Sequence, residues 1–430
     1  MAFFFSRDTK VFMTHSYDGT TANTALFEIP VLDGFSFSQG TNTSEVTLNE
    51  AANSTGYSKR GRAMFTDSYA PAEWSFSTYM RPTVSGSSNA AVSNQHAGNA
   101  KVFAVEGPLW SAMSAPGGTQ VATSYDKATG VFESATLDFA NGAAVYEPKE
   151  FNFAKSNQVT LGVFDLYFVL GASKDTDTTE FASGTDGVTV YKLANCSIGS
   201  ASIDFDIDGI ATVAWSGQGQ KIEEDIGSGE GSALNTAASG TTALGLINEG
   251  ISSTSNYVRQ KLTNLTMVYD AANTTGVKTG SMLGTSNNTF SGITLTGGNI
   301  TIENNLTYLT PETLGSVNQP LGHVMGTRSV SGNFTCYLND ATGGSAELFE
   351  DLQESREIIT NAFDLKFSIG GQGESNHINV HVPKAHLELP SHSIEDVISV
   401  DVNFHGLATD LTSATEANAT NEVKVTYAAS

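Results

Sequence analysis

The chain has 430 residues, which is more than one typical domain needs, so two or three domains are expected. It carries 21 Lys and Arg against 45 Asp and Glu, and the net charge of −24 disfavours tight binding of phosphates, which requires cations that displace counterions. Only 15% of the residues are charged, and the abundance of Ser, Thr, Asn and Gly favours β-sandwiches and barrels with many turns.

The opening stretch, MAFFFSRDTK, has an apolar run that is too short for a signal peptide, and no later stretch is long enough to span a membrane. The two cysteines, Cys196 and Cys336, each lie within an alternating strand pattern. This pattern predicts reduced cysteines in a protein that folds in the cytoplasm, without a disulfide framework or a zinc site.

The first clear strand is LDGFSFSQG, from Leu32 to Gly40, and it has a counterpart in FSGITLTGG, from Phe290 to Gly298. Gly34 matches Gly292 at an offset of 292 − 34 = 258, and the same offset matches Phe76 in WSFSTYM with Phe334 in GNFTCYL. Both segments keep the same alternation of inward and outward side chains, which a slip of one residue would destroy. The predicted duplicated core comprises Phe35, Phe37, Phe76, Ile293, Leu295 and Phe334.

Later strands repeat as well. FDLYFVL at 164–170 resembles FDLKFSI at 363–369, with an offset of 199, and IATVAWSG at 210–217 resembles SVDVNFHG at 399–406, with an offset of 189. The difference of ten residues falls in a hairpin connection, where insertions are tolerated. We therefore predict a tandem duplication of one domain.

The predicted fold is mainly β: two copies of a β-sandwich or barrel of about six to eight strands, each with one flanking helix. Copy one covers 1–217 and contains an extra segment at about 85–155, with a short helix opening at Pro108 and β-like sequence near 121–146. A Gly/Ser/Ala-rich connector follows at 218–262, and copy two covers 263–430. Its helix, SAELFEDLQESREIIT, is predicted to begin at Ser345 as N-cap and to bury Leu348, Leu352 and Ile359.

Three acidic residues in SIDFDIDG resemble the start of a calcium-binding loop, but the twelfth position of that loop is Trp215 where a glutamate is needed. The pattern favours a strand that turns its acids outward. Histidines in NHINVHVPKAHLELPSH occupy the polar face of another strand, and spacing places no carboxylate beside them to complete a metal site. No catalytic motif is present, so we predict no enzyme, cofactor or metal.

The segments IPVLDGFSFSQGTNTSEVTLNE and APAEWSFSTYMRP, the later helix, and the closing Phe-Asp-Leu and Gly-ended strands resemble tail tube proteins of long-tailed bacteriophages. The resemblance implies a β-sandwich with a flanking helix, assembled into rings that stack into a hollow tube for DNA ejection. It also implies a structural virion protein that is assembled in the host cytoplasm. Some phage tubes fuse two tube domains in one chain, which implies here a homotrimeric, pseudo-hexameric ring of 3 × 2 = 6 domains.

The partners that the resemblance implies are other copies of the chain, tape-measure and tail terminator or baseplate proteins, and a sheath where one is present. DNA would pass without specific binding, and no membrane partner is expected. Long loops at 41–67 and 299–327 are predicted to reach a neighbouring ring. The basic cluster YSKRGRAMF would meet acids there, or else form a solvated loop. The inter-ring candidates are Lys59, Arg60 and Arg62.

A wall that conducts DNA should present acids and few cations, because each fixed cation would hold phosphates. The lumen-facing candidates, for each of which a solvated outer surface is the alternative, are Asp204, Asp206, Asp208, Glu395, Asp401, Glu45 and Glu303. Two other classes remain open. One is a secreted or surface β-sandwich adhesin, and the other is an enzyme on a β-scaffold, which would need two carboxylates in a cleft.

Overall fold

The computed structural model describes residues 4–16, 24–46, 63–85, 101–114, 124–126, 131–133, 150–153, 162–171, 180–181, 188–224, 234–235, 246–247, 257–269, 277, 281–284, 288–314, 316–354, 362–371, 376–393, 397–409, 411 and 421–428.

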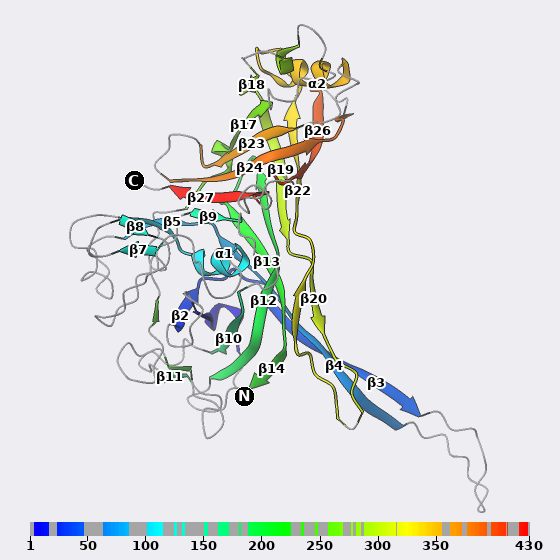
Figure 1. Cartoon of the computed structure of the whole chain (residues 1–430). Helices are drawn as coiled ribbons and strands as arrows, with labels where there is room; N and C mark the ends of the chain where they lie inside the picture. Colours follow the sequence, from blue (N-terminus) through cyan, green and yellow to red (C-terminus); the bar gives the residue numbers. More distant parts are fainter. Residues whose placement is uncertain are drawn as a thin grey trace, which may run out of the picture.

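The fold is mainly β, as predicted, and its strands form two halves (Figure 1). The N-terminal half contains β1 (Thr9–Ser16), β2 (Thr24–Ile29), β3 (Ser36–Val46), β4 (Ala63–Tyr79), β10 (Phe164–Leu170), β12 (Thr189–Asp206), β13 (Thr212–Gly219) and β14 (Lys221–Glu224). The C-terminal half contains β17 (Asn264–Tyr269), β18 (Thr289–Phe290), β19 (Thr294–Glu303), β22 (Ser329–Tyr337), β23 (Phe363–Ile369), β24 (His377–Leu387), β25 (Ser391–Ser393), β26 (Ser399–Gly406) and β27 (Lys424–Ala428).

Shorter elements complete the described part of the chain. They are β5 (Pro82–Ser85), β6 (Lys101–Ala104), α1 (Gly107–Ser114), β7 (Ser124–Asp126), β8 (Val131–Glu133), β9 (Glu150–Asn152), β11 (Glu180–Phe181), β15 (Leu234–Asn235), β16 (Leu246–Ile247), β20 (Leu306–Leu309), β21 (Gly322–Met325) and α2 (Ser345–Glu354).

The two halves pair their strands in the same antiparallel order. In the N-terminal half the order is β1–β10–β12–β13–β4–β3. In the C-terminal half it is β17–β23–β24–β26–β22–β19. The repeated order is what a tandem duplication would produce, because strand order is a property of the whole domain.

One pair of strands repeats in register as well as in order. Val169 lies opposite Val190 in β10 and β12, and Ser368 lies opposite Asn379 in β23 and β24, which agrees with offsets of 199 and 189. Both pairs have a β-bulge at the same relative place, after Phe164 and after Phe363. Polar pairing repeats too: Lys192 Nζ lies 2.9 Å from Asp165 Oδ2, and at the same offsets His381 Nε2 lies 2.7 Å from Asp364 Oδ1.

The first strand departs from its sequence offset. Phe37 lies opposite Trp74, whereas Leu295 lies opposite Cys336, so the paired residues are 74 − 37 = 37 apart in one half and 336 − 295 = 41 in the other. If Phe76 and Phe334 correspond, the pairing makes Ile300 the counterpart of Phe37, an offset of 263 instead of 258. The match of Gly34 with Gly292 is therefore wrong in register. The shift of five residues is odd, and the β-bulge between Leu295 and Gly297 is what keeps Leu295 and Ile300 on the same face.

The last strand is shifted by a smaller amount. Phe76 lies opposite Trp215 and Phe334 opposite Val402, which gives an offset of 402 − 215 = 187 in place of the 189 inferred from the closing glycines. A shift of two residues keeps the same side chains in the core. The predicted set of core residues is consequently insensitive to this error.

The predicted core residues lie in or against one large hydrophobic cluster that includes both halves. Phe76, Phe334 and Ile293 are buried, whereas Phe35, Phe37 and Leu295 are partly buried and pack against the cluster. Phe37 contacts Phe168 with ring centroids 4.6 Å apart. The cluster continues between the halves because Phe205 on β12 contacts Phe367 on β23, with ring centroids 5.5 Å apart.

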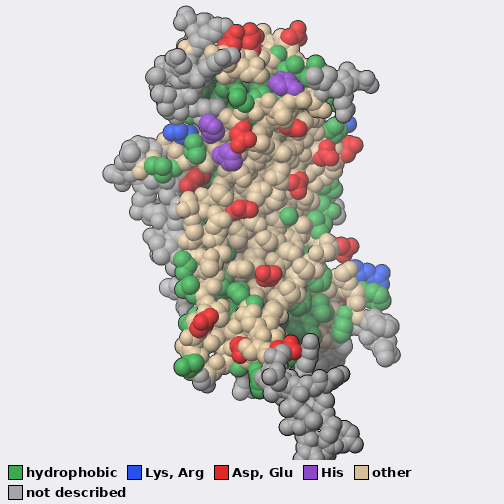
Figure 2. All heavy atoms as spheres, turned by 90° about the vertical axis from the view of Figure 1, so that its right-hand side faces the viewer, with side chains coloured by type: hydrophobic (Ala, Val, Ile, Leu, Met, Phe, Trp, Pro, Cys, Tyr) green, Lys and Arg blue, Asp and Glu red, His purple; other side chains and the backbone are tan. Residues whose placement is uncertain are grey.

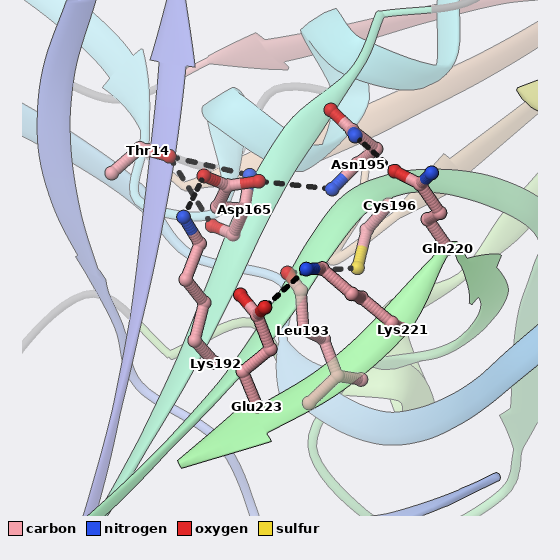
Figure 3. A network of polar contacts seen from close by, with 9 residues as sticks. All are labelled: Thr14, Asp165, Lys192, Leu193, Asn195, Cys196, Gln220, Lys221 and Glu223. Atoms are coloured by element: carbon pink, nitrogen blue, oxygen red, sulfur yellow. Dashed lines mark hydrogen bonds and ion pairs between the residues drawn. The ribbon is translucent and has the colours of Figure 1, made fainter. Parts of the chain in front are cut away.

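Strand β12 changes sheets at a polar corner (Figure 3). Its first part pairs with β10 and its second part with β13. At the corner Asn195 has φ = 52°, in the left-handed region that asparagine tolerates. The backbone N–H of Asn195 donates to Asp165 Oδ1 at 2.9 Å, and its side-chain amide donates to Gln220 Oε1 at 2.6 Å. These bonds fix the direction in which the second part of β12 leaves the corner.

Both described helices start where the sequence predicts them. In α2, Leu348 and Leu352 are buried and Glu347 accepts a hydrogen bond from the backbone of Gly343 at 2.8 Å, while Ile359 lies outside the described residues. Ser345 does not cap the amides of its own helix, since its hydroxyl instead donates to the carbonyl of Tyr337 at 2.7 Å. That contact ties the start of α2 to the end of β22.

The extra segment of the N-terminal half contacts the C-terminal half. β9 pairs with the last strand, β27, and α1 places Trp110 at the junction. The Trp110 ring lies 4.6 Å from the Trp215 ring of β13, and its Nε1 donates to Tyr427 Oη of β27 at 2.8 Å. Tyr427 in turn donates to Glu106, which is 1% exposed. The described part of the insertion therefore fastens the two halves together.

This junction predicts a pH-dependent stability. Burial raises the pKa of Glu106 from 4.5 to about 7, although the hydroxyl of Tyr427 and the nearby Arg81 oppose the shift. The folded state thus binds the proton more tightly, so this contribution to stability is complete below pH 4.5 and is lost as the pH rises through 7. For this group the loss is on the order of 3 kcal/mol.

In Glu106→Gln, which stays neutral, we expect the free energy of unfolding measured by denaturant titration to fall less between pH 5 and pH 8 than in the wild type. The exposed Glu73→Gln is the control, and it should retain the wild-type slope. Equal slopes for Glu106→Gln and the wild type would contradict the assignment.

An arm leaves the body of the molecule at the lower right of Figure 1. It consists of residues 41–46 of β3 and 63–70 of β4, and its side chains Met64 and Phe65 are 61% and 59% exposed. The segment between β20 and β21 lies along it, because Tyr69 and Asn318 form a backbone hydrogen bond of 2.9 Å. The segments that the sequence predicts as long loops are largely strands where the structure describes them, and their described parts meet at this contact.

Candidate functional site: the polar face of the shared sheet

The two halves share one sheet, because β12 of the first pairs antiparallel with β19 of the second. Seven residue pairs form this contact, from Ser200 opposite Glu303 to Asp206 opposite Gly297. We call this pairing the seam. It makes a continuous sheet in the order β3–β4–β13–β12–β19–β22–β26–β25. Strands that the sequence assigns to separate copies therefore present a common face.

The face opposite the core carries small polar side chains in rows that cross the seam. Residues directly opposite in neighbouring antiparallel strands share a face, so the register defines each row. One row contains Thr212, Asp204, Asn299, Asn333 and Asn403. The row beside it contains Ala214, Ser202, Thr301, Ser331 and His405.

A further row brings together acids that the sequence placed in different copies. Asp206 lies opposite Gly297, Gly297 opposite Thr335, Thr335 opposite Asp401, and Asp401 opposite Ser391. The row after Ser202 on the other side contains Ser216, Ser200, Glu303 and Ser329. Four of the predicted lumen candidates thus occupy this one face, which we call the polar face: Asp204, Asp206, Glu303 and Asp401.

Hydrogen bonds join these side chains to one another. Ser200 Oγ and Ser216 Oγ are 2.7 Å apart, and Ser36 Oγ and Ser75 Oγ are 2.8 Å apart. Asn299 donates to Ser202 at 2.8 Å and also to Asp204. The side chains are in this way held flat against the sheet, and many of their donors are already bonded within it.

The charge on this face is negative and spread out. Figure 2 shows a broad surface of small polar side chains and backbone with separate Asp and Glu, while Lys and Arg appear at its margins. None of the rows described above contains a Lys or Arg. A face with this composition repels phosphates and gives them few cations to bind.

The remaining lumen candidates lie elsewhere. Asp208 is in the exposed bend after β12 instead of in the strand, and Glu45 is on the arm, opposite Met64. Glu45 was matched with Glu303 by the offset of 258. The pairing of β3 with β4 replaces that offset with 263, so the two glutamates do not correspond. Glu395 and the basic cluster Lys59, Arg60 and Arg62 lie outside the described residues.

An open hollow of about 480 Å³ interrupts the polar face over Gly199 and Gly217. Glycine is required at 217, because a Cβ there would lie 2.2 Å from the carbonyl oxygen of Ser197 and 2.5 Å from the Trp74 ring. The hollow contains two carboxylates, Glu73 and Glu303, and both are exposed to solvent. This differs from the enclosed pair of carboxylates with distinct environments that acid–base catalysis uses.

The histidines and acids of the described residues form no metal-binding cluster. There, no group of three or more His, Cys, Asp or Glu is arranged to hold a metal ion. His381 pairs with Asp364, a partner that spacing along the sequence did not reveal. Within the same part of the chain, no helix combines the length and apolar character needed to cross a membrane.

Comparison with known proteins identifies a relative along nearly the whole chain. The chain is 27% identical over 413 residues to "Tail tube protein pb6" of Escherichia phage T5, an alignment that covers 95% of this chain and 74% of the relative. No family model matches. The similarity confirms the predicted resemblance to phage tail tube proteins and supports a structural role in the tail tube, as a component of the virion.

Proposed function

We propose that this chain assembles with copies of itself into rings that stack into the tail tube of a phage, and that the polar face of the shared sheet lines the channel through which DNA is ejected. The carrying observation is the polar face itself: rows of Ser, Thr, Asn, Asp and Glu continue across both halves without Lys or Arg. DNA can move along such a wall because these rows offer its phosphates no Lys or Arg to bind.

The subunit arrangement that we propose is a trimer of chains with six half-chain units per ring. The repeated strand order supports two equivalent units in each chain, and 3 × 2 = 6 units would give a pseudo-hexamer. Copies of one chain that meet head to tail close into rings when the rotation between them closes. Tape-measure and terminator or baseplate proteins, and a sheath where one is present, are the proposed partners at the tube's interior, ends and outside.

Negative-stain electron microscopy of the purified protein tests this function. We expect hollow tubes with regularly spaced rings, and averaged cross-sections with three-fold symmetry that approximates six-fold. Particles that remain single chains at every protein and salt concentration would refute the assembly, and solid fibrils would refute the channel. A map in which the polar face lies on the outer surface would reject the proposed lining.

The arm supports a second part of the proposal, namely contact between stacked rings. Reversal of the three charges of the predicted basic cluster, with Lys59→Glu, Arg60→Glu and Arg62→Glu together, should leave single rings intact and shorten or abolish tubes. The reason is that the cluster would then face the acids of the next ring with like charge. Ring formation and tube length can be measured by size-exclusion chromatography and electron microscopy.

The matched control retains the charges, with Lys59→Arg, Arg60→Lys and Arg62→Lys, and should give tubes of wild-type length. Tubes of normal length from the charge-reversed protein would show that the cluster is a solvated loop.

A further inference from the structure

The shared sheet ends in two strands that each have a single partner. Among the described residues, β3 is paired with β4 alone at one end of the sheet, and β25 is paired with β26 alone at the other. Unpaired backbone N–H and C=O groups along such edges bind another strand readily. Natural proteins cover or block these edges unless they are used for assembly.

The seam shows what each of these edges binds. In the C-terminal half, β24 and β25 are the counterparts of β12, at an offset of 189. In the N-terminal half, β3 is the counterpart of β19, at an offset of 263. One end of the sheet is therefore β3, the counterpart of β19. The edge of β3 that corresponds to the edge with which β19 pairs with β12 has no partner strand among the described residues. The other end is β25, the counterpart of the second part of β12. The edge of β25 that corresponds to the edge with which β12 pairs with β19 also has no partner strand among the described residues.

We infer that β25 of one chain pairs antiparallel with β3 of a second copy of this chain, in the register set by the seam within each chain. The inference rests on the proposed function, since it specifies how neighbouring chains in a ring meet. Ser202 lies opposite Thr301 in the seam, so 202 + 189 = 391 should lie opposite 301 − 263 = 38. In the same way Asp204 and Asn299 predict that Ser393 lies opposite Ser36.

The side chains at these positions fit that register. Ser391 and Ser393 lie opposite Asp401 and Ser399, and so they belong to the polar face. Ser36 and Ser38 belong to the same face, because the intervening Phe37 points into the core. The inferred pairing thus continues the polar rows from chain to chain without turning a core residue outward.

The chemistry of the seam is also retained. Ser202 and Thr301 place their hydroxyl oxygens 3.3 Å apart, and the inferred counterparts, Ser391 and Ser38, again offer two hydroxyls. Next to β25, the side chain of Leu389 is 72% exposed, although Leu387 two residues before it is buried. A second chain at this edge would cover that side chain, and its burial favours association.

Such a contact joins different surfaces of the two chains. Because β25 binds β3 and not another β25, each chain keeps one edge of each kind for the next neighbour. Repetition of one seam, within and between chains, consequently makes all units around a ring equivalent in their sheet contacts. The three-chain closure proposed above follows if the same rotation separates all six units.

Cysteine cross-linking in assembled tubes tests the register. Tubes of the Ser38→Cys, Ser391→Cys double variant are oxidised with copper–phenanthroline and analysed by non-reducing denaturing electrophoresis. We expect covalent dimers and trimers, with no larger product if three chains close the ring. The Ser202→Cys, Thr301→Cys variant is the positive control, because its intrachain pair occupies the seam position that serves as the template.

A second control separates pairing from mere proximity. Ser399 lies on β26, one strand inside the edge and two residues along from Asp401, so Cα atoms of Ser38 and Ser399 would be about 12 Å apart and beyond disulfide reach. Ser38→Cys with Ser399→Cys should cross-link at least about tenfold more slowly than Ser38→Cys with Ser391→Cys. The native Cys196 and Cys336 are buried. Variants with only one of the introduced cysteines, Ser38→Cys or Ser391→Cys, give the background rate of cross-linking.

The outcomes distinguish this inference from the proposed function. Tubes that form normally and oxidise the seam control, but yield no interchain product from Ser38→Cys with Ser391→Cys, would overturn the inferred pairing and leave the tube function intact. A wild-type protein that never forms rings or tubes would instead refute the proposed function on which the pairing rests.

Discussion

Asn333→Lys is expected to convert a channel that DNA slides through into one that retains DNA. Asn333 is exposed at the centre of the polar face, between Asn299 and Asn403 in the row that crosses the seam. A lysine there places one fixed cation per chain in every ring of the tube. Each cation that contacts a phosphate releases counterions, so the attraction accumulates along the tube and weakens with salt.

DNA ejection from phage particles whose tails contain the variant is the first measurement, and we expect the ejection rate at low salt to fall by about tenfold or more. Raising the salt concentration should restore much of the rate. Purified Asn333→Lys tubes should also retain short DNA that wild-type tubes release. Asn333→Gln, which is polar and uncharged, is the matched control and should behave as the wild type.

The contrary result would be clear. Ejection from Asn333→Lys particles at the wild-type rate and without salt dependence would place Asn333 outside the channel. Failure of the variant to form tubes would instead point to a contact between chains at this position. Electron microscopy of the same preparation separates these two outcomes.

Trp110→Ala is expected to be the most destabilising single substitution at the junction of the two halves. Trp110 is completely buried, packs against Trp215, Phe151 and Phe153, and donates a hydrogen bond to Tyr427. Loss of the ring leaves a cavity and costs about 3–5 kcal/mol. The midpoint of thermal unfolding, measured by circular dichroism, should fall by about 10 °C.

Trp110→Phe separates packing from hydrogen bonding. It keeps an aromatic ring in the site and removes the Nε1 donor. The lost hydrogen bond should lower the free energy of unfolding by about 1 kcal/mol, in addition to the cost of the smaller ring. If Trp110→Ala unfolds at the wild-type temperature, the inserted segment does not fasten the halves. A loss of tube assembly at temperatures where the chain remains folded would connect this junction to the geometry of the ring.

Sequence alone predicted many of the strands and which of their side chains point inward, although β14, β20 and β21 lie in segments that it assigned to a connector or a loop. The alternation of Phe205 with Asp204 and Asp206 needs no partner strand, because successive side chains in a strand point to opposite faces whatever lies beside them. The same is true of the Phe-Asp-Leu strands, where distinctive residues fixed the offset of 199 that the pairing of Val169 and Ser368 later matched. The short helix at Trp110 was likewise visible from its proline and apolar residues.

Register and neighbours were decided only by the tertiary structure. Phe37 was matched with Leu295 although the pairing makes Ile300 its counterpart, because the β-bulge between Leu295 and Gly297 puts both residues on the core face and cannot be located from the alternation alone. The seam between β12 and β19, the row that joins Asp206 to Asp401, and the contact of Trp110 with Tyr427 all join residues far apart in the chain. Backbone hydrogen bonds and packing between distant segments select such contacts, and no local pattern encodes them.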